Sequence, residues 1–306
     1  IEPMEPTKYI WFDGGMVPWA DANVHVLSHA LHYGTGIFEG IRAYETPDGT
    51  AVFRLTDHMR RLHHSAKAYS MKLDWSVEEL VEAAKETLRV NELEAGYVRP
   101  ITFLELGAVG LNPSGARVRT AIITWRWGAY LGEEGVRNGI RVAVSSWRRF
   151  PNTAFPNAKA TGTYTNSILA KMEAVNAGFD EAIMLNQDGV ISEGSGENLF
   201  VIRNGEVYTP PIAVGCLDGL TRHAVMTLLA DEGHNIIEKT LDRSDLYYAE
   251  EAFFTGTAAE VTPIREIDNR AIGNGTPGPV TRRAQGLYAD LVSGKLNSHH
   301  DWLEYV

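Results

Sequence analysis

A lysine among small residues offers the first candidate for chemistry. Lys159 lies in the segment Asn157-Ala-Lys-Ala-Thr-Gly162, which holds no acidic residue. Because an amine without an ion partner and away from water is held less firmly as the ammonium, its neutral form can attack a carbonyl and form a Schiff base. A solvated loop lysine explains the same segment, so both interpretations stay open here.

Two carboxylates stand in a glycine-rich segment further along, Ser192-Glu-Gly-Ser-Gly-Glu-Asn198. A carboxylate fixed opposite a pyridine nitrogen keeps a pyridoxal cofactor protonated, which lets the ring withdraw electrons. Tight turns made of Ser and Gly are also ordinary loop material. The segment is therefore compatible with a cofactor partner and with a structural turn.

Two further turns could bind a phosphate. Leu217-Asp-Gly-Leu-Thr-Arg222 opens a predicted helix, whose first amides are free donors for an anion. Thr255-Gly-Thr-Ala-Ala259 places a hydroxyl and small residues at the end of a predicted strand. Loop chemistry without a ligand accounts equally well for each turn taken alone.

One region of the chain differs in charge from the chain as a whole. The chain has 28 Lys and Arg against 39 Asp and Glu, a net charge of −11, which disfavours nucleic acid as a partner. Residues 135–172 nevertheless contain no Asp or Glu. Chance or an anionic ligand explains this cationic segment, whose basic residues are Arg137, Arg141, Arg148, Arg149, Lys159 and Lys171.

Two other motifs favour simpler interpretations. Gly273-Asn-Gly-Thr-Pro-Gly278 matches a dinucleotide-binding pattern, but Pro277 and the missing acidic partner indicate a turn. His25, His29 and His32 have a ligand-like spacing without an evident third ligand or orienting carboxylate, so we expect no metal site. A single cysteine, Cys216, and the absence of a long apolar run or a leader predict a cytoplasmic protein away from membranes.

The elements that must position these residues form two groups. A hairpin at residues 9–17, helices at 57–69 and 76–88, and strands at 97–106 and 117–127 predict a small α+β domain over residues 1–129. The second helix carries a capping box, Ser76-Val-Glu-Glu79. Four glycines within residues 128–139 predict an interdomain loop at 130–139, and alternating strands and helices predict a larger α/β domain over 140–306.

In order along the chain, these segments resemble the branched-chain amino acid aminotransferases, which are fold-type IV pyridoxal-phosphate enzymes. The resemblance spans nearly the whole chain and implies that the larger domain, residues 140–306, is a pseudo-barrel that binds the cofactor. It rests on Tyr9-Ile-Trp-Phe-Asp-Gly14, Ser28-His-Ala-Leu-His-Tyr-Gly-Thr-Gly-Ile-Phe-Glu-Gly-Ile-Arg42, Arg61-Leu-His-His-Ser-Ala-Lys67, Tyr97-Val-Arg-Pro100, Trp127-Gly-Ala-Tyr-Leu-Gly132, Lys159, Ser192-Glu-Gly-Ser-Gly-Glu-Asn-Leu-Phe200, Gly219-Leu-Thr-Arg222 and Gly256-Thr-Ala-Ala-Glu-Val-Thr-Pro263.

The resemblance implies a set of cofactor residues. Lys159 would bind pyridoxal 5'-phosphate covalently and act as the catalytic base, and Glu193 would pair with the pyridine nitrogen. Tyr164 would bind the phenolic oxygen, and Leu217 would pack on the ring. The phosphate would be held by Arg61, Leu220, Thr221 and Thr257.

The resemblance also implies a substrate pocket. Its apolar walls would be Tyr33, Phe38, Trp127 and Tyr130. Tyr97, with the amides of Thr257 and Ala258, would take the α-carboxylate, and Arg99 would pair with the distal carboxylate of glutamate. Val109 lies where relatives send a loop into a neighbouring subunit's site, which predicts a homodimer or a larger homo-oligomer such as a hexamer.

The predicted reaction is reversible transfer of the amino group of L-leucine, L-isoleucine or L-valine to 2-oxoglutarate. Asp218, where many relatives have proline, and Thr161-Gly-Thr163 depart from the family pattern beside the predicted cofactor. The alternatives are a D-amino acid or (R)-amine aminotransferase of the same fold, a zinc hydrolase that uses the histidines, and a non-catalytic pyridoxal-phosphate carrier.

Overall fold

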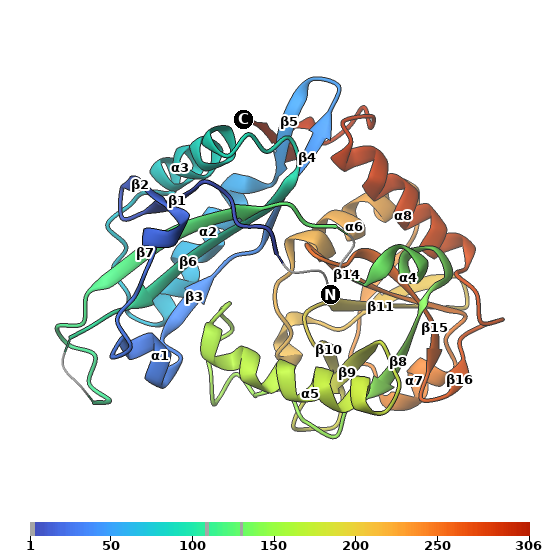
Figure 1. Cartoon of the computed structure of the whole chain (residues 1–306). Helices are drawn as coiled ribbons and strands as arrows, with labels where there is room; N and C mark the ends of the chain where they lie inside the picture. The colour runs from blue at the N-terminus through green and yellow to red at the C-terminus, as the bar shows by residue number, and fades with distance from the viewer. Residues whose placement is uncertain (1–3, 108–109, 129–130) are drawn as a thin grey trace. The chain divides into compact units, whose positions relative to one another are not determined.

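The computed structural model describes residues 4–107, 110–128 and 131–306. The chain divides into two compact units, shown with their elements in Figure 1. Unit 1 comprises Ile1–Trp127, Ala158–Thr163 and Leu291–Val306, and unit 2 comprises Gly128–Asn157 and Tyr164–Asp290. The prediction that residues 140–306 form one domain is wrong for two segments, because Ala158–Thr163 and Leu291–Val306 belong to unit 1.

Unit 1 is built on an eight-stranded sheet. The order is β17-β5-β4-β6-β7-β1-β2, and β3 pairs with β6. The longest pairing joins β6 and β7 in antiparallel register from Tyr97 opposite Trp125 to Leu104 opposite Val118. The strands are β1 (Tyr9–Phe12), β2 (Gly15–Pro18), β3 (Gly36–Phe38), β4 (Ile41–Thr46), β5 (Gly49–Phe53), β6 (Gly96–Leu104), β7 (Val118–Trp125) and β17 (Leu303–Tyr305).

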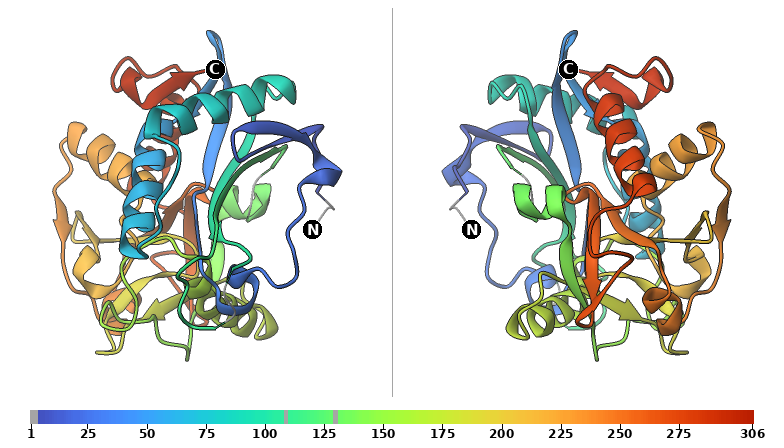
Figure 2. Two further views of the ribbon diagram at one scale, coloured as in Figure 1. Left: turned by 90° about the vertical axis from the view of Figure 1, so that its left-hand side faces the viewer. Right: turned by 90° about the vertical axis from the view of Figure 1, so that its right-hand side faces the viewer.

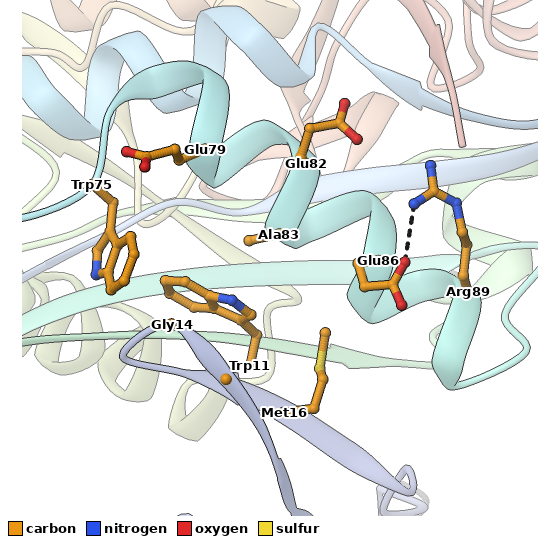
Figure 3. A pocket seen from close by; sticks show the side chains of 10 residues that line it. Trp11, Gly14, Met16, Trp75, Glu79, Glu82, Ala83, Glu86 and Arg89 are labelled. Carbon is orange, nitrogen blue, oxygen red and sulfur yellow. Dashed lines mark hydrogen bonds and ion pairs between the residues drawn. The ribbon is translucent and has the colours of Figure 1, made fainter.

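Helices α1 (His29–Tyr33), α2 (Leu55–Ala68) and α3 (Val77–Val90) complete unit 1. α2 and α3 pack on each other and on the sheet, because each has one apolar face. The predicted capping box is confirmed: Ser76 Oγ accepts the Glu79 N–H, and the Glu79 carboxylate accepts the Ser76 N–H at 2.7 Å. Beside it, Trp75 meets Trp11 edge to face with 5.2 Å between ring centroids, as Figure 3 shows.

Unit 2 contains a nine-stranded mixed sheet in the order β10-β9-β8-β15-β14-β11-β12-β13, with β16 paired to β15. The pairs β8–β9, β8–β15 and β12–β13 are parallel, and the others are antiparallel. The strands are β8 (Ile140–Val144), β9 (Glu181–Leu185), β10 (Ile191–Gly194), β11 (Asn198–Arg203), β12 (Glu206–Thr209), β13 (Ile236–Glu238), β14 (Glu251–Gly256), β15 (Glu260–Ile267) and β16 (Arg270–Ala271).

The helices of unit 2 are α4 (Gly132–Asn138), α5 (Tyr164–Asn176), α6 (Leu220–Asp231), α7 (Arg243–Tyr247) and α8 (Pro279–Val292), whose last two residues belong to unit 1. α4 packs on β15, α5 on β8 and β9, and α6 on β13 and β14. The right-hand view of Figure 2 shows α8 in red. The expected loop at 130–139 is wrong, since α4 occupies most of it. Within the described ranges, no helix is both long and apolar enough to cross a membrane.

The capping box gives a stability prediction. Replacing Ser76 with Ala removes the side chain that accepts the Glu79 N–H at the start of α3. We expect the free energy of unfolding to fall by about 1 kcal/mol, measured by denaturant titration. Ser298→Ala, at an exposed position, serves as the control and should change it by less than about 0.5 kcal/mol. Equal values for the two variants would contradict the assigned cap.

Candidate active site

Lys159 is fixed in unit 1 by its backbone. Its carbonyl accepts the Phe38 N–H at 3.0 Å at the end of β3, and its own N–H donates to Ser65 Oγ of α2 at 3.2 Å. The next residue, Ala160, forms an isolated bridge with Ile37. The half-buried side chain places Nζ 4.9 Å from the centroid of the Phe38 ring. The lysine thus has a defined position beside an aromatic face.

Arg61, a predicted phosphate ligand, takes part in a buried ion pair. Its Nε and Nη2 donate to the two carboxylate oxygens of Glu39 at 2.7 and 2.8 Å. His58 contacts the same carboxylate through Nδ1 at 2.7 Å. Burial opposes the ionisation of Glu39, but the charge and hydrogen bonds of Arg61, with His58, hold its pKa well below the usual range. Sequence reasoning gave neither Glu39 nor His58 a role beside Arg61.

The predicted substrate residues Phe38, Tyr97, Arg99 and Trp127 come together in unit 1. The Arg99 guanidinium lies 4.7 Å from the Phe38 ring centroid and 5.2 Å from that of Tyr97, and Nη2 donates to the Tyr97 hydroxyl at 3.1 Å. Trp127 meets Tyr97 edge to face at 4.4 Å. Arg99 Nε is buried without an acceptor among the described residues. A cation within apolar walls therefore retains an unused donor.

One predicted wall residue of unit 1, Tyr33, makes none of these contacts. Tyr33, on α1, is 44% exposed and its ring lies 4.7 Å from that of His29. Val109 and Tyr130 lie outside the described residues. Their predicted roles remain predictions.

In unit 2, Glu193 and Leu217 are in direct contact. Glu193 is 6% exposed, and its Oε2 accepts the Leu217 N–H at 3.0 Å. Arg149 Nε lies 2.8 Å from Glu193 Oε1, but its N–H is not aligned with that oxygen, so the contact is an ion pair and not a hydrogen bond. Asn198 Nδ2 donates to the Leu217 carbonyl at 2.9 Å. The backbone of Leu217 is thereby held on both sides.

The start of α6 offers amides to an anion. Gly219 precedes the helix and supplies no side-chain cap to the first turn, where the predicted phosphate ligands Leu220 and Thr221 lie. A Cβ on Gly219 would stand 2.0 Å from Asn198 Oδ1, so only glycine fits there. The first turn of a helix is suited to a phosphate. The remaining predicted residues of unit 2 are Thr257 and Ala258, in the turn between β14 and β15, and Tyr164, the first residue of α5.

The acid-free segment is engaged by acids from elsewhere in the sequence. Its Lys171 pairs with buried Glu181 at 2.6 Å and its Arg141 with Glu266 at 2.8 Å, besides the contact of Arg149 with Glu193. The anionic ligand that we considered for the segment is therefore not needed to explain these three residues. Carboxylates distant in the sequence form ion pairs with these basic residues.

Glu197 forms an acidic pair with Glu181 next to the Glu193 strand. Both are buried, at 4% and 0% exposure, and Glu181 accepts hydrogen bonds from Ser195 Oγ and Lys171. Glu197 accepts the Gly196 N–H at 3.1 Å. Burial raises the pKa of Glu197 well above its ordinary value, and the charges of Glu181 and Glu193 add to this, against the Gly196 amide and Lys171.

His29 and one surface pocket of unit 1 involve other residues. His29 bonds to Thr35 Oγ1 and the Gly110 carbonyl, and the described residues contain no cluster of three His, Cys, Asp or Glu side chains that could hold a metal ion. The pocket in Figure 3, lined by Trp11, Trp75 and the acidic side of α3, contains none of the predicted site residues.

The comparisons with known proteins agree over nearly the whole chain. The family model for class IV aminotransferases matches residues 36–267. The branched-chain-amino-acid aminotransferase of Pseudomonas aeruginosa is 50% identical over 97% of both chains. The crystal structure of the Escherichia coli branched-chain amino acid aminotransferase is similar with a TM-score of 0.96 and 45% identity, covering 97% of this chain and 99% of that one.

A second similar structure is named with its cofactor state. It is the branched-chain amino acid aminotransferase of Thermobaculum terrenum in its PLP-form, or holo-form. The TM-score is 0.92 and the identity 33%, over 98% of each chain.

Glu197 gives a pH prediction. A carboxyl whose pKa is raised by folding keeps its proton in the folded state, so stability declines as pH rises from the unfolded pKa toward the folded one. Glu197→Gln removes this titration. The stability of the variant relative to wild type should therefore increase with pH, by at most about 1.4 kcal/mol per pH unit.

The measurement is denaturant unfolding at intervals from about pH 5 to about pH 9. Glu133→Gln, an exposed position on α4, is the control and should leave the pH dependence unchanged. A Glu197→Gln protein whose stability runs parallel to wild type across this range would show that Glu197 ionises normally.

Proposed function

Because the chain belongs to the class IV aminotransferases, we propose that it transfers the amino group of L-leucine, L-isoleucine or L-valine to 2-oxoglutarate with pyridoxal 5'-phosphate. The reaction is reversible and gives the branched-chain 2-oxo acid and L-glutamate. The observation that carries the substrate choice is Arg99, a cation with an unused buried donor inside aromatic walls. This combination accepts an apolar side chain and the distal carboxylate of glutamate.

The residues present fit the cofactor. Lys159, half-buried on a fixed backbone, suits the cofactor aldehyde. The buried Glu193 carboxylate, which accepts a backbone N–H, suits the ring nitrogen, and the start of α6 suits the phosphate. When bound, the cofactor withdraws electrons from the α-carbon of the amino acid.

Lys159 is the proposed catalytic residue. Its Nζ would hold the cofactor covalently, and the same amine, once freed by the substrate, would carry the proton that leaves the substrate α-carbon. One side chain can serve both half-reactions because the two transfers use the same atoms in opposite order. The Phe38 ring, 4.9 Å from Nζ, limits the volume in which this amine moves.

The remaining cofactor residues orient the ring and anchor its phosphate. Glu193 is the proposed partner of the ring nitrogen, Leu217 packs on the ring and Tyr164 binds the phenolic oxygen. The Glu193 contact with the Leu217 amide links two of these groups directly. The proposed phosphate ligands are Arg61, Thr257 and the amides of Leu220 and Thr221, which combine a cation with a helix start.

Substrate recognition is proposed for the cluster around Arg99. Phe38 and Trp127 supply apolar walls, with Tyr33 and Tyr130 as further candidates. The α-carboxylate binds Tyr97 and the amides of Thr257 and Ala258. We also propose a cytoplasmic homo-oligomer, in which the Val109 loop reaches a neighbouring subunit.

Loss of Lys159 tests the reaction itself. Lys159→Ala should abolish the absorption band of the covalently held cofactor and lower turnover of L-leucine with 2-oxoglutarate by at least about a thousandfold, since no other group carries the proton. Lys67→Ala, at an exposed position on α2, is the control and should keep both. A Lys159→Ala protein with the wild-type band and turnover would refute the assignment.

Arg99 gives a prediction about substrate selection. In Arg99→Gln the charged donor for the distal carboxylate is lost, so kcat/KM for 2-oxoglutarate should fall by about 10-fold to 100-fold. The half-reaction with L-leucine should change by less than about threefold, because its side chain has no charge to pair. The two half-reactions are followed separately by the change in cofactor absorbance.

Arg117→Gln is the matched control, because this arginine precedes β7 of the same sheet and its side chain is 64% exposed. It should leave both half-reactions unchanged. Equal losses for L-leucine and 2-oxoglutarate in Arg99→Gln would mean that Arg99 supports the fold of the pocket and does not select the acid. D-Alanine, tested beside L-leucine, distinguishes the D-amino acid alternative.

A further inference from the structure

Glu39 is a fully buried carboxylate that the proposed reaction does not use. Its side chain is 0% exposed and lies just after β3, next to Phe38. Oε1 accepts the N–H of Arg61 Nε at 2.7 Å, and Oε2 accepts from Arg61 Nη2 at 2.8 Å. Burying a carboxylate costs several kcal/mol unless charged donors compensate it, so a residue held in this way needs a reason.

His58 completes the group from the same helix as Arg61. The two residues are three positions apart on α2, which places their side chains on one face. Burial lowers the pKa of His58, and the charges of Arg61 and Lys159 add to this, against the hydrogen bond and charge of Glu39. A neutral His58 therefore donates from Nδ1 to Glu39 Oε2, 2.7 Å away. Three donors from α2 fix the carboxylate.

The fork between Glu39 and Arg61 fixes the guanidinium plane. A bidentate pair with a carboxylate allows only one relative orientation of the two groups, whereas an arginine without such a partner retains its rotamer freedom. The fork engages Nε and Nη2, so Nη1 lies on the other side of the guanidinium. Ordering the side chain before a ligand arrives reduces the entropy lost on binding.

We propose that Glu39 is a positioning residue that holds Arg61 in the orientation required by the cofactor phosphate, with His58 fixing Glu39 in turn. The inference rests on the proposed function, because it takes Arg61 as a phosphate ligand. Two effects of Glu39 oppose each other. Its negative charge repels a phosphate, and its fork orders the cation that binds one. Orientation dominates, because the carboxylate occupies only one edge of the guanidinium.

The test separates the phosphate from the rest of the cofactor. Pyridoxal has the ring and aldehyde of pyridoxal 5'-phosphate but no phosphate, so the ratio of the two dissociation constants measures the phosphate contribution alone. Both constants are obtained by absorbance titration of the apoprotein. In Glu39→Gln, the preference for the phosphorylated form should fall by about tenfold, while the affinity for pyridoxal changes by less than about twofold.

Two further variants separate orientation from charge. Glu39→Asp keeps the charge but is one methylene shorter, so it breaks the fork and should also lower the preference. In an Arg61→Gln background, Glu39→Gln should have no further effect on the preference, since it acts through Arg61. His58→Asn, which retains a side-chain donor, should lower the preference less than His58→Ala.

The same helix offers a matched control. Arg54 Nε donates to Asp57 Oδ2 at 2.7 Å, so α2 carries a second arginine and carboxylate pair that no proposal assigns to the cofactor. Asp57→Asn also removes a carboxylate beside an arginine. It should leave the preference for the phosphorylated form at the wild-type value.

Three outcomes would overturn the proposal. These are an unchanged or increased phosphate preference in Glu39→Gln, equal weakening of both ligands, and an Arg61→Gln background in which Glu39→Gln still lowers the preference. If Glu39→Gln does not fold, Glu39→Asp and the His58 pair decide the question in the same assay. Failure of the proposed function can be distinguished from failure of this proposal, because the wild-type protein would then show no change in cofactor absorbance with L-leucine.

Discussion

A charge removed from water must find an opposite charge or several donors nearby, and this constraint shapes the functional residues of both units. The chain has a net charge of −11, yet three of its buried carboxylates each have a cationic partner close by. Arg61 and His58 hold Glu39, Lys171 holds Glu181, and Arg149 faces Glu193. In each case the partner comes from the same unit as the carboxylate.

A second constraint is the space beside the backbone at two glycines. Gly40 follows Glu39, and a Cβ there would lie 1.9 Å from the Tyr97 hydroxyl. In unit 2, a Cβ on Gly219 would lie 2.0 Å from Asn198 Oδ1. At Gly40 the missing side chain makes room for the Tyr97 hydroxyl, which accepts a hydrogen bond from Arg99. At Gly219 it makes room for the Asn198 side chain, which donates to the Leu217 carbonyl.

Local signals predicted local structure well. The capping box at Ser76 defined the start of α3, and the family resemblance is confirmed by the family model and the relatives. The predicted fold class is confirmed as well. The loop expected at 130–139 was wrong because four glycines suggested irregular structure, whereas Glu133 and Glu134 in the first turn favour α4.

Long-range partners could not be read from one sequence. Segment 158–163 belongs to unit 1 because Ala160 bridges Ile37 and Lys159 bonds to Phe38, contacts between residues more than a hundred positions apart. The acid-free segment suggested an anionic ligand because Glu181, Glu193 and Glu266 lie outside it. Glu39 and His58 were missed for the same reason, since only folding places α2 beside the end of β3.

The contact of Arg149 with Glu193 shows how such a pair serves a proposed ligand. Arg149 Nε lies 2.8 Å from Oε1 without an aligned N–H, whereas the Leu217 amide donates to Oε2. The arginine therefore places a positive charge beside the carboxylate without a hydrogen bond to it. Glu39 is arranged in the opposite way, since Arg61 and His58 hydrogen-bond to both of its oxygens, which suits a carboxylate that orients a neighbour and binds no ligand itself.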